Sequence, residues 1–243
     1  MPIIYLADFY AEMRLLRETR CKVISSIKSS TQQPNPYDLR ELRKIESRLK
    51  SIKKDDALFQ LKTHQDDVIA LELDYELGEL QKDKIFLEDG EDALLKHFQD
   101  IHPNFKNEVD NTVEFLKHQK FKHFITDRDG TISNYCGRYQ SSVQSIYNAL
   151  FLSNFTKNIE GNSIIITSAP LYNIGLADIS VQPEEDFILA GSKGRELIDE
   201  NGQKHERTIK EDQQQKLNEL NSAIKNLLKK DEYSSFRYIG SGL

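Results

Sequence analysis

Apolar residues recur three and four positions apart through most of the first half of the chain, which is the spacing of one helix face. The pattern covers residues 3–28, 39–52 and 66–87. It is interrupted by helix breakers at 31–38, 88–92 and 102–104. Asp38 is the expected N-cap of the second helix. We therefore predict a helical region over residues 1–119, packed as an antiparallel bundle or hairpin.

The pattern changes near residue 120. Short β-branched runs that end in polar residues lie at 120–127, 161–170 and 184–194, and a helical pattern occupies 141–159 between the first two. Strands that alternate with a helix predict a βαβ unit and a parallel sheet. Ligands bind beyond the carboxyl ends of such strands. We therefore expect the polar ends of the first two runs to meet at one edge of the sheet.

The last part of the chain has a third pattern. Residues 207–231 are strongly amphipathic with helical spacing, and 233–243 read as a strand that begins and then stops with the chain.

Composition and charge exclude some classes of protein. The chain has 243 residues, a net charge of −6 and two cysteines, Cys21 and Cys136. An acidic chain without a basic stretch argues against a general nucleic-acid binder. Two distant cysteines make no disulfide framework. We find neither a signal-peptide pattern nor an apolar run of membrane length. We therefore expect a soluble, cytoplasmic protein with no nucleic-acid or membrane partner.

The candidate chemistry lies in "FITDRDGT", residues 124–131. Asp-Gly is common in turns, so a purely structural turn is one interpretation. A calcium loop fits poorly, because the glycine comes too early and Arg138 stands where the closing Glu belongs. The functional interpretation is phosphoryl transfer. Asp127 would be the covalent nucleophile, Asp129 the acid and base, and Gly130 would let backbone N–H groups face the phosphate.

The end of the second predicted strand, "IIITS", adds a hydroxyl group. Thr167 or Ser168 could bond a phosphoryl oxygen. Ser and Thr often end strands, so this signal has weight only beside the aspartate motif. Mg²⁺ is the expected cation, since it takes hard oxygen ligands and keeps waters.

Together, "FITDRDGT" and "IIITSAP" resemble the haloacid dehalogenase-like phosphohydrolases over about 121–200. The longer stretch from 124 to 152, with "LAGSKGREL", is similar to the glucosylglycerol-phosphate phosphatases, to which trehalose-6-phosphate phosphatases are related. The resemblance implies a Rossmann-like parallel sheet whose first part is 120–200, with an α/β cap opening at 201–243. The family's later lysine and Gly-Asp motifs are not found, so the chain corresponds to the first part of such an enzyme, apparently truncated.

The resemblance also implies roles for individual residues. Asp127 would be the nucleophile and a Mg²⁺ ligand, and Asp129 the acid and base, also placed at the metal through its carbonyl. The residues expected to bind phosphate are Gly130, Thr131, Thr167 and Ser168. Those expected to touch the substrate are Arg138, Lys193 and Arg195, although solvated or structural charges are the commoner role of such residues.

The implied reaction is hydrolysis of a small sugar phosphate, leading with glucosylglycerol 3-phosphate in compatible-solute synthesis under osmotic stress. Three alternatives stay open. One is a phosphatase of the trehalose-6-phosphate type, and another is a non-catalytic helical interaction protein. The third is another chemistry of the same superfamily, such as a phosphomutase, whereas the loop of a dehalogenase would not need the second aspartate.

Overall fold

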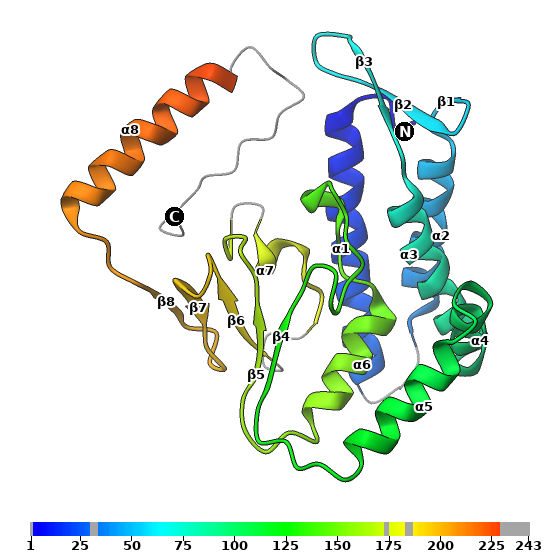
Figure 1. Cartoon of the computed structure of the whole chain (residues 1–243). Coiled ribbons are helices and arrows are strands. Elements are labelled where there is room, and N and C mark those ends of the chain that lie inside the picture. Colours follow the sequence, from blue (N-terminus) through cyan, green and yellow to red (C-terminus); the bar gives the residue numbers. More distant parts are fainter. Residues whose placement is uncertain (1, 30–33, 173–174, 183–186, 229–243) are drawn as a thin grey trace.

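The computed structural model describes residues 2–29, 34–172, 175–182 and 187–228 (Figure 1). Three helices lie side by side in its N-terminal region: α1 (Leu6–Lys28), α2 (Pro36–Lys50) and α3 (Asp74–Lys84). Their apolar faces form one buried cluster that includes Phe9, Met13, Leu16, Leu42, Ile45, Leu49 and Leu80. The helices predicted at 3–28 and 39–52 are confirmed.

A small antiparallel sheet lies between α2 and α3 in the sequence. It consists of β1 (Lys54–Asp55), β2 (Leu58–Lys62) and β3 (Val68–Leu71). The prediction of a helix from 66 was therefore wrong, since α3 begins only at Asp74. Asp66 has a left-handed backbone, φ 65°, in the turn before β3. In β2 the buried residues Phe59 and Leu61 alternate with half-buried neighbours, which is the period of a strand.

The ends of the helices depend on local chemistry. Asn35, rather than Asp38, caps α2: its side chain accepts a hydrogen bond from the Tyr37 N–H, and Pro36 occupies the first turn, where its missing N–H costs nothing. The predicted break near residue 90 is confirmed, because the π-helical turn Ile85–Asp89 ends at Gly90 with φ 91°. Two further helices follow, α4 (Glu91–Ile101) and α5 (Phe105–Leu116).

The second half contains a five-stranded sheet in the order β4-β5-β6-β7-β8. Its strands are β4 (Phe124–Asp127), β5 (Ser163–Ile166), β6 (Ile188–Gly191), β7 (Glu196–Ile198) and β8 (Lys204–Glu206). The first three are parallel, as predicted, and β6, β7 and β8 pair antiparallel. The sheet is thus mixed rather than wholly parallel, because the chain turns back directly after β6.

Helices accompany the sheet on one side. The predicted crossover helix is α6 (Ile146–Thr156), which lies between β4 and β5 in sequence, and the short α7 (Leu176–Ile179) precedes β6. Helix α6 also packs against α1 and α3, and so joins the two halves. The amphipathic pattern near the end is α8 (Glu211–Leu228). The strand predicted at 233–243 lies outside the described residues.

The two faces of the parallel strands differ in how they are covered. One face buries Thr126, Ile165 and Leu189 against the helices, and Phe124 meets Phe155 of α6 with 5.0 Å between ring centroids. The alternate residues point the other way. On that side Ile125 is 60% exposed and Ile166 37% exposed. Within the described part of the chain, no helix is both long and apolar enough to cross a membrane.

Candidate functional site

The two polar strand ends predicted to meet lie at one edge of the sheet. Strand β4 ends at Asp127, which pairs in parallel register with Ile166, the last residue of β5. Thr167 and Ser168 follow immediately. Because β4 is the outermost strand of the sheet, Asp127 lies at the carboxyl end of a strand with one neighbour, on the less covered face.

The loop after β4 is a tight turn. Gly130 has φ 83°, a conformation that glycine adopts without strain. The N–H groups of Thr131, Ile132 and Ser133 all donate to the Arg128 carbonyl, and the Gly130 N–H donates to Ser133. In this conformation the N–H groups of Gly130 and Thr131 are therefore used inside the turn. Both interpretations of the motif remain compatible with this geometry, since a turn can also carry a site.

Arg128, between the two aspartates, was not singled out from the sequence. Its side chain is buried, and its guanidinium donates to the Asp129 carboxylate and to the Ser142 carbonyl. Asp129 is half-buried, whereas Asp127 is exposed and its carboxylate has no hydrogen-bond partner among the described residues. The two carboxylates thus differ in environment. The sequence indicated a role for Arg128 only through its position, as a cation between two acids.

Thr167 and Ser168, which the sequence left as equivalent candidates, differ in the structure. Thr167 is 3% exposed, and its Oγ1 accepts a hydrogen bond of 3.2 Å from the Ala169 N–H. Ser168 is exposed. Asp127 pairs with Ile166, the last residue of β5, and Ser168 lies two residues beyond that pair. The exposed hydroxyl is therefore that of Ser168.

A turn after β6 brings Lys193 to this edge. Ser192, Lys193 and Gly194 have φ values of 50°, 57° and 81°, which is costly for the two residues that carry a side chain. The Lys193 N–H donates to the Thr167 carbonyl over 3.2 Å, and the Ser192 N–H to Ala169 over 2.7 Å. Lys193 itself is exposed. Its backbone contact with the end of β5 places it with the strand-end residues.

The two predicted arginines lie in different surroundings. Arg138 faces the helical region, where its Nη2 lies 2.9 Å and 3.0 Å from the two carboxylate oxygens of Glu76 and also donates to the Glu72 carbonyl. Arg195 is half-buried at the start of β7, and its N–H donates to Gly191. The structure therefore gathers Asp127, Asp129, Thr167 and the loops around them, but directs Arg138 toward α3.

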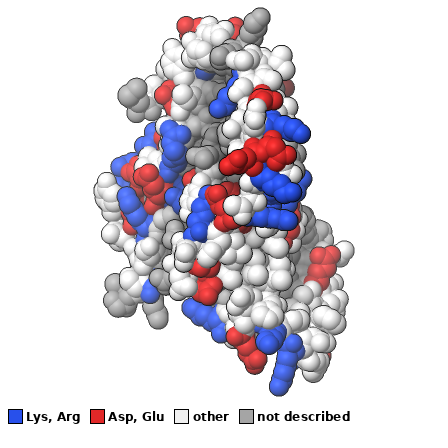
Figure 2. Space-filling view, turned by 90° about the vertical axis from the view of Figure 1, so that its left-hand side faces the viewer, with Lys and Arg blue, Asp and Glu red and all other residues white. Residues whose placement is uncertain are grey.

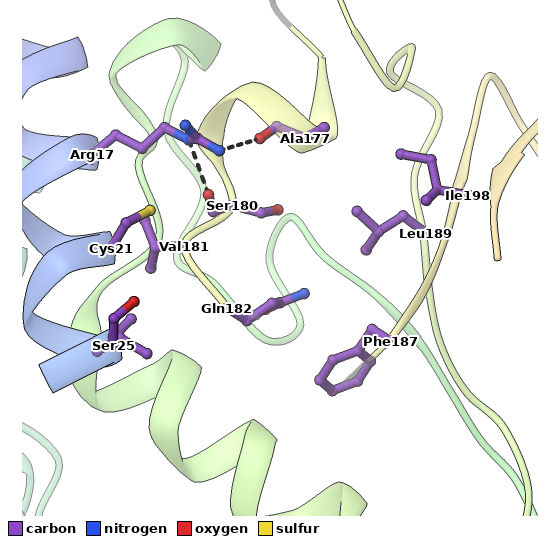
Figure 3. Close-up of a pocket in the computed structure, with 11 residues that line it drawn as sticks. Arg17, Cys21, Ser25, Ala177, Ser180, Val181, Gln182, Phe187, Leu189 and Ile198 are labelled. Atoms are coloured by element: carbon purple, nitrogen blue, oxygen red, sulfur yellow. Dashed lines mark hydrogen bonds between the residues drawn. The ribbon is translucent and has the colours of Figure 1, made fainter. Parts of the chain in front are cut away.

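A separate cavity of about 240 Å³ lies between α1 and the sheet (Figure 3). Arg17 crosses its rim and donates to the carbonyls of Ala177, over 2.9 Å, and Ser180, over 3.0 Å. Phe187 and Leu189 line the cavity from the face of the sheet that the helices cover. Asp127 is on the opposite face, so this cavity is not part of the strand-end site.

Charge is distributed without a large patch of one sign on the face drawn in Figure 2. Lysine and arginine side chains alternate there with aspartates and glutamates among the residues that are shown in colour. Several of the pairs are ion pairs, such as Arg48 with Glu12 at 2.6 Å. Such mixing is typical of a solvated surface.

Comparison with known proteins relates both halves of the chain to one group of enzymes. The family model described as trehalose-6-phosphate phosphatase N-terminal helical bundle domain matches residues 5–105. The family model described as trehalose-6-phosphate phosphatase, C-terminal, matches residues 124–243.

Individual relatives agree with the family models. The chain is 31% identical to the UDP-forming alpha,alpha-trehalose-phosphate synthase 2 of Caenorhabditis elegans, over 98% of this chain and 21% of that protein. It is 31% identical to a trehalose-phosphatase of Brugia malayi, over 62% of this chain and 33% of that protein. The chain spans about a fifth of the length of the synthases that it matches over nearly its whole extent.

These comparisons sharpen the resemblance found in the sequence. They support a haloacid dehalogenase-type sugar phosphatase, and the mixed sheet with its helical N-terminal region is consistent with such a fold. They give no support to the narrower likeness to glucosylglycerol-phosphate phosphatases. The helical region and the sheet of the chain are each similar to a domain of the trehalose-6-phosphate phosphatases.

Proposed function

We propose that this chain is the part of a phosphatase that carries the reacting carboxylates, and that the substrate is trehalose 6-phosphate. The observation that carries the proposal is the exposed, unpaired carboxylate of Asp127 at the carboxyl end of β4. Asp129 lies two residues beyond it and two strand-end hydroxyls lie on the neighbouring strand. The family matches on both sides of this motif give the reaction class.

In the proposed reaction an oxygen of Asp127 attacks the phosphorus, and the bond from phosphorus to the sugar oxygen breaks. This gives an aspartyl phosphate and the free sugar. Asp127 suits this role because no hydrogen bond within the described residues competes for its carboxylate. Ser168, exposed just beyond the end of β5, and Thr167 would hold phosphoryl oxygens, and Lys193 would add positive charge at the same edge.

Asp129 would move the proton. Its carboxyl group gives a proton to the departing sugar oxygen and later takes one from the water that hydrolyses the aspartyl phosphate. In the structure its carboxylate is held by Arg128. Asp129 must therefore turn from Arg128 toward the substrate, and Arg128, anchored to the Ser142 carbonyl, stays behind as its resting partner.

The donor set fits a magnesium ion. No cluster of three His, Cys, Asp or Glu side chains suited to a metal occurs in the described ranges. Mg²⁺ needs no such cluster, since it commonly takes one or two protein carboxylates, several waters and the substrate phosphate. The Asp127 carboxylate and the Asp129 carbonyl would hold it. When bound it supplies the positive charge that offsets repulsion between carboxylate and phosphate.

The choice of sugar rests on the relatives. The strand-end residues recognise a phosphate group and do not distinguish trehalose 6-phosphate from glucosylglycerol 3-phosphate. Proteins named trehalose-phosphatase match the chain. The interpretation as a glucosylglycerol-phosphate phosphatase has no such support from the relatives. We therefore place trehalose 6-phosphate first.

The test is release of inorganic phosphate from both sugar phosphates, with Mg²⁺ and with EDTA. We expect release from trehalose 6-phosphate that requires Mg²⁺. Asp127→Asn should lower kcat by about a thousandfold or more, because an amide cannot form the acyl phosphate. Asp110→Asn, on the exposed surface of α5, is the matched control and should leave kcat unchanged.

Two outcomes would contradict parts of the proposal. Turnover by Asp127→Asn near the parent level would contradict the assignment of Asp127 as the nucleophile. Preference for glucosylglycerol 3-phosphate would contradict trehalose 6-phosphate as the substrate. A folded protein that releases phosphate from neither compound would instead favour a non-catalytic role. That second candidate has one observation in its favour: five of the matching proteins are named synthases, and the chain covers only 14–22% of each.

A further inference from the structure

Helix α3 buries a row of three carboxylates. Glu76 is 1% exposed, Glu79 5% and Asp83 0%. Their spacing of three and four residues places them on one face of the helix. Acidic side chains are almost never so deeply buried unless they are paired. The partners of this row therefore show what the face is for.

Each carboxylate bonds a residue of the segment 134–147, which follows the aspartate loop. Glu76 accepts from Arg138, as described above. Glu79 accepts from the Asn134 side chain over 3.1 Å and from the Tyr147 hydroxyl over 3.2 Å. Asp83 accepts from the backbone N–H of residue 146, at the start of α6, over 2.7 Å.

Two of the carboxylates also have cationic partners outside the segment: Glu79 pairs with Lys82 at 2.6 Å, and Asp83 with Arg20 of α1 at 2.7 Å. Arg20 in turn donates to the carbonyl of Val143 over 2.8 Å, so this pair also holds the segment.

The same stretch of chain holds the loop that carries Asp129. Arg128, which pairs with Asp129, donates to the carbonyl of Ser142. The side chain of Asn148, in the first turn of α6, donates to the carbonyl of Ile132. A continuous set of polar contacts thus leads from α3, through 134–148, to the loop 128–132.

Stability alone gives a poor account of this arrangement. Buried charges lose their hydration, and well-packed apolar residues in their place are often as stable or more so. Hydrogen bonds, in contrast, fix both distance and direction. A contact face made of three carboxylates therefore constrains where the segment lies more tightly than an apolar face would.

We propose that Glu76, Glu79 and Asp83 are positioning residues of the phosphatase site. By holding the segment 134–147 on α3, they set the place of Arg128 and Asp129 relative to Asp127. The helical region then takes part in catalysis through contacts on its third helix. This inference rests on the proposed function.

The experiment compares kinetics and stability in four variants of the same protein. Glu76→Ala removes the partner of Arg138, and Glu76→Gln keeps an oxygen that can accept from it. Leu42→Ala, in the bundle core on α2, is the control, because it leaves a cavity but removes no hydrogen bond of the row. Tyr147→Phe removes only the hydroxyl that bonds Glu79, and it tests the same row if Glu76→Ala does not fold.

We expect Glu76→Ala to lower kcat for trehalose 6-phosphate about tenfold to a hundredfold, with KM changed less than about threefold, because small misplacements of reacting groups cost that much. Glu76→Gln should recover most of the loss. Tyr147→Phe should show a smaller decrease in kcat. Leu42→Ala should lower the unfolding midpoint while kcat of the folded protein stays at the parent value.

Hydrogen exchange of the peptide 128–147 gives a readout that does not need activity. Faster exchange there in Glu76→Ala, but not in Leu42→Ala, supports the anchoring. Unchanged kcat and unchanged exchange in Glu76→Ala would overturn the inference while leaving the proposed function intact. Failure of the parent protein to release phosphate would overturn the proposed function and the catalytic part of this inference, whereas the exchange result would still decide the anchoring.

Discussion

The helical region and the sheet differ in how completely they bury their apolar residues. In the bundle, Phe9, Ile45 and Leu80 are fully enclosed by α1, α2, α3 and their neighbours. In the sheet, one face is covered by helices, whereas on the other Ile188 and Ala190 of β6 are buried and Ile125 and Ile166, on β4 and β5, remain exposed. The bundle therefore has the features of a closed scaffold, and the β4–β5 part of the sheet those of an open surface.

The candidate chemistry lies on the open side. Asp127 and Ser168 are both exposed at the carboxyl-end edge of the sheet, and Asp127 is on the face of Ile125 and Ile166. A group that must reach a substrate has to stay accessible, whereas the groups that position it can be buried. Under the proposed function the two regions divide these tasks, with the buried carboxylates of α3 on the positioning side.

The largest expected effect is in the bundle. Phe9→Ala should lower the free energy of unfolding by about 3–5 kcal/mol, because the fully buried ring leaves both its transfer energy and a cavity behind. Urea unfolding followed by circular dichroism measures it. A loss below about 1 kcal/mol would mean that the bundle core is not closed around α1.

A smaller, pH-dependent effect is expected beside the site. Burial opposes ionisation of Glu196, but hydrogen bonds from Ser192 and from the Leu171 N–H, with Lys204 nearby, hold the pKa of Glu196 below its ordinary value of 4.5. Its folded pKa is lowered. The stabilisation is therefore complete above pH 4.5 and is lost as the pH falls through the folded value.

The measurement compares unfolding midpoints of the parent and Glu196→Gln across pH. The parent should be more stable at pH 7, and the difference should shrink below pH 4.5. Glu200→Gln, at an exposed position shortly after β7, is the control and should change little. A gap that stays constant down to pH 3 would show that the carboxylate does not hold the turn at Lys193.

The smallest effect is expected on the open face of the sheet. Ile125→Thr should change the free energy of unfolding by less than about 0.5 kcal/mol, because the side chain is 60% exposed and threonine also favours strands. The same urea titration compares it with Phe9→Ala. A loss similar to that of Phe9→Ala would show that this face is covered, and would remove the contrast between the two regions.

Much of the fold could be predicted from local patterns. Helix α1 follows from apolar residues at helical spacing. The helical stretch ends at Gly90, where the backbone has a positive φ that glycine adopts easily. The small sheet β1–β3 was missed, because a strand of five residues gives a short alternation that the flanking helical pattern hides. Asn35 was missed as the cap of α2 because Asp38 offers the same kind of side chain.

The candidate site was predictable to a similar degree. The meeting of the Asp127 and Thr167 strand ends follows from the parallel βαβ rule. The difference in exposure between Thr167 and Ser168 could not be predicted from the sequence, because it depends on how the end of β5 lies in the sheet. The partner of Arg138 could not be predicted, since Glu76 lies 62 residues away in sequence.

The sequence by itself determined most of the helices, the three parallel strands and which strand ends carry candidate site residues, because periodicity and turns depend on residues a few positions apart. Tertiary structure alone decided that the α3 carboxylates hold the segment after Asp129 and that Lys193 reaches the end of β5. Those contacts join segments distant in sequence, and they depend on how whole helices and strands pack.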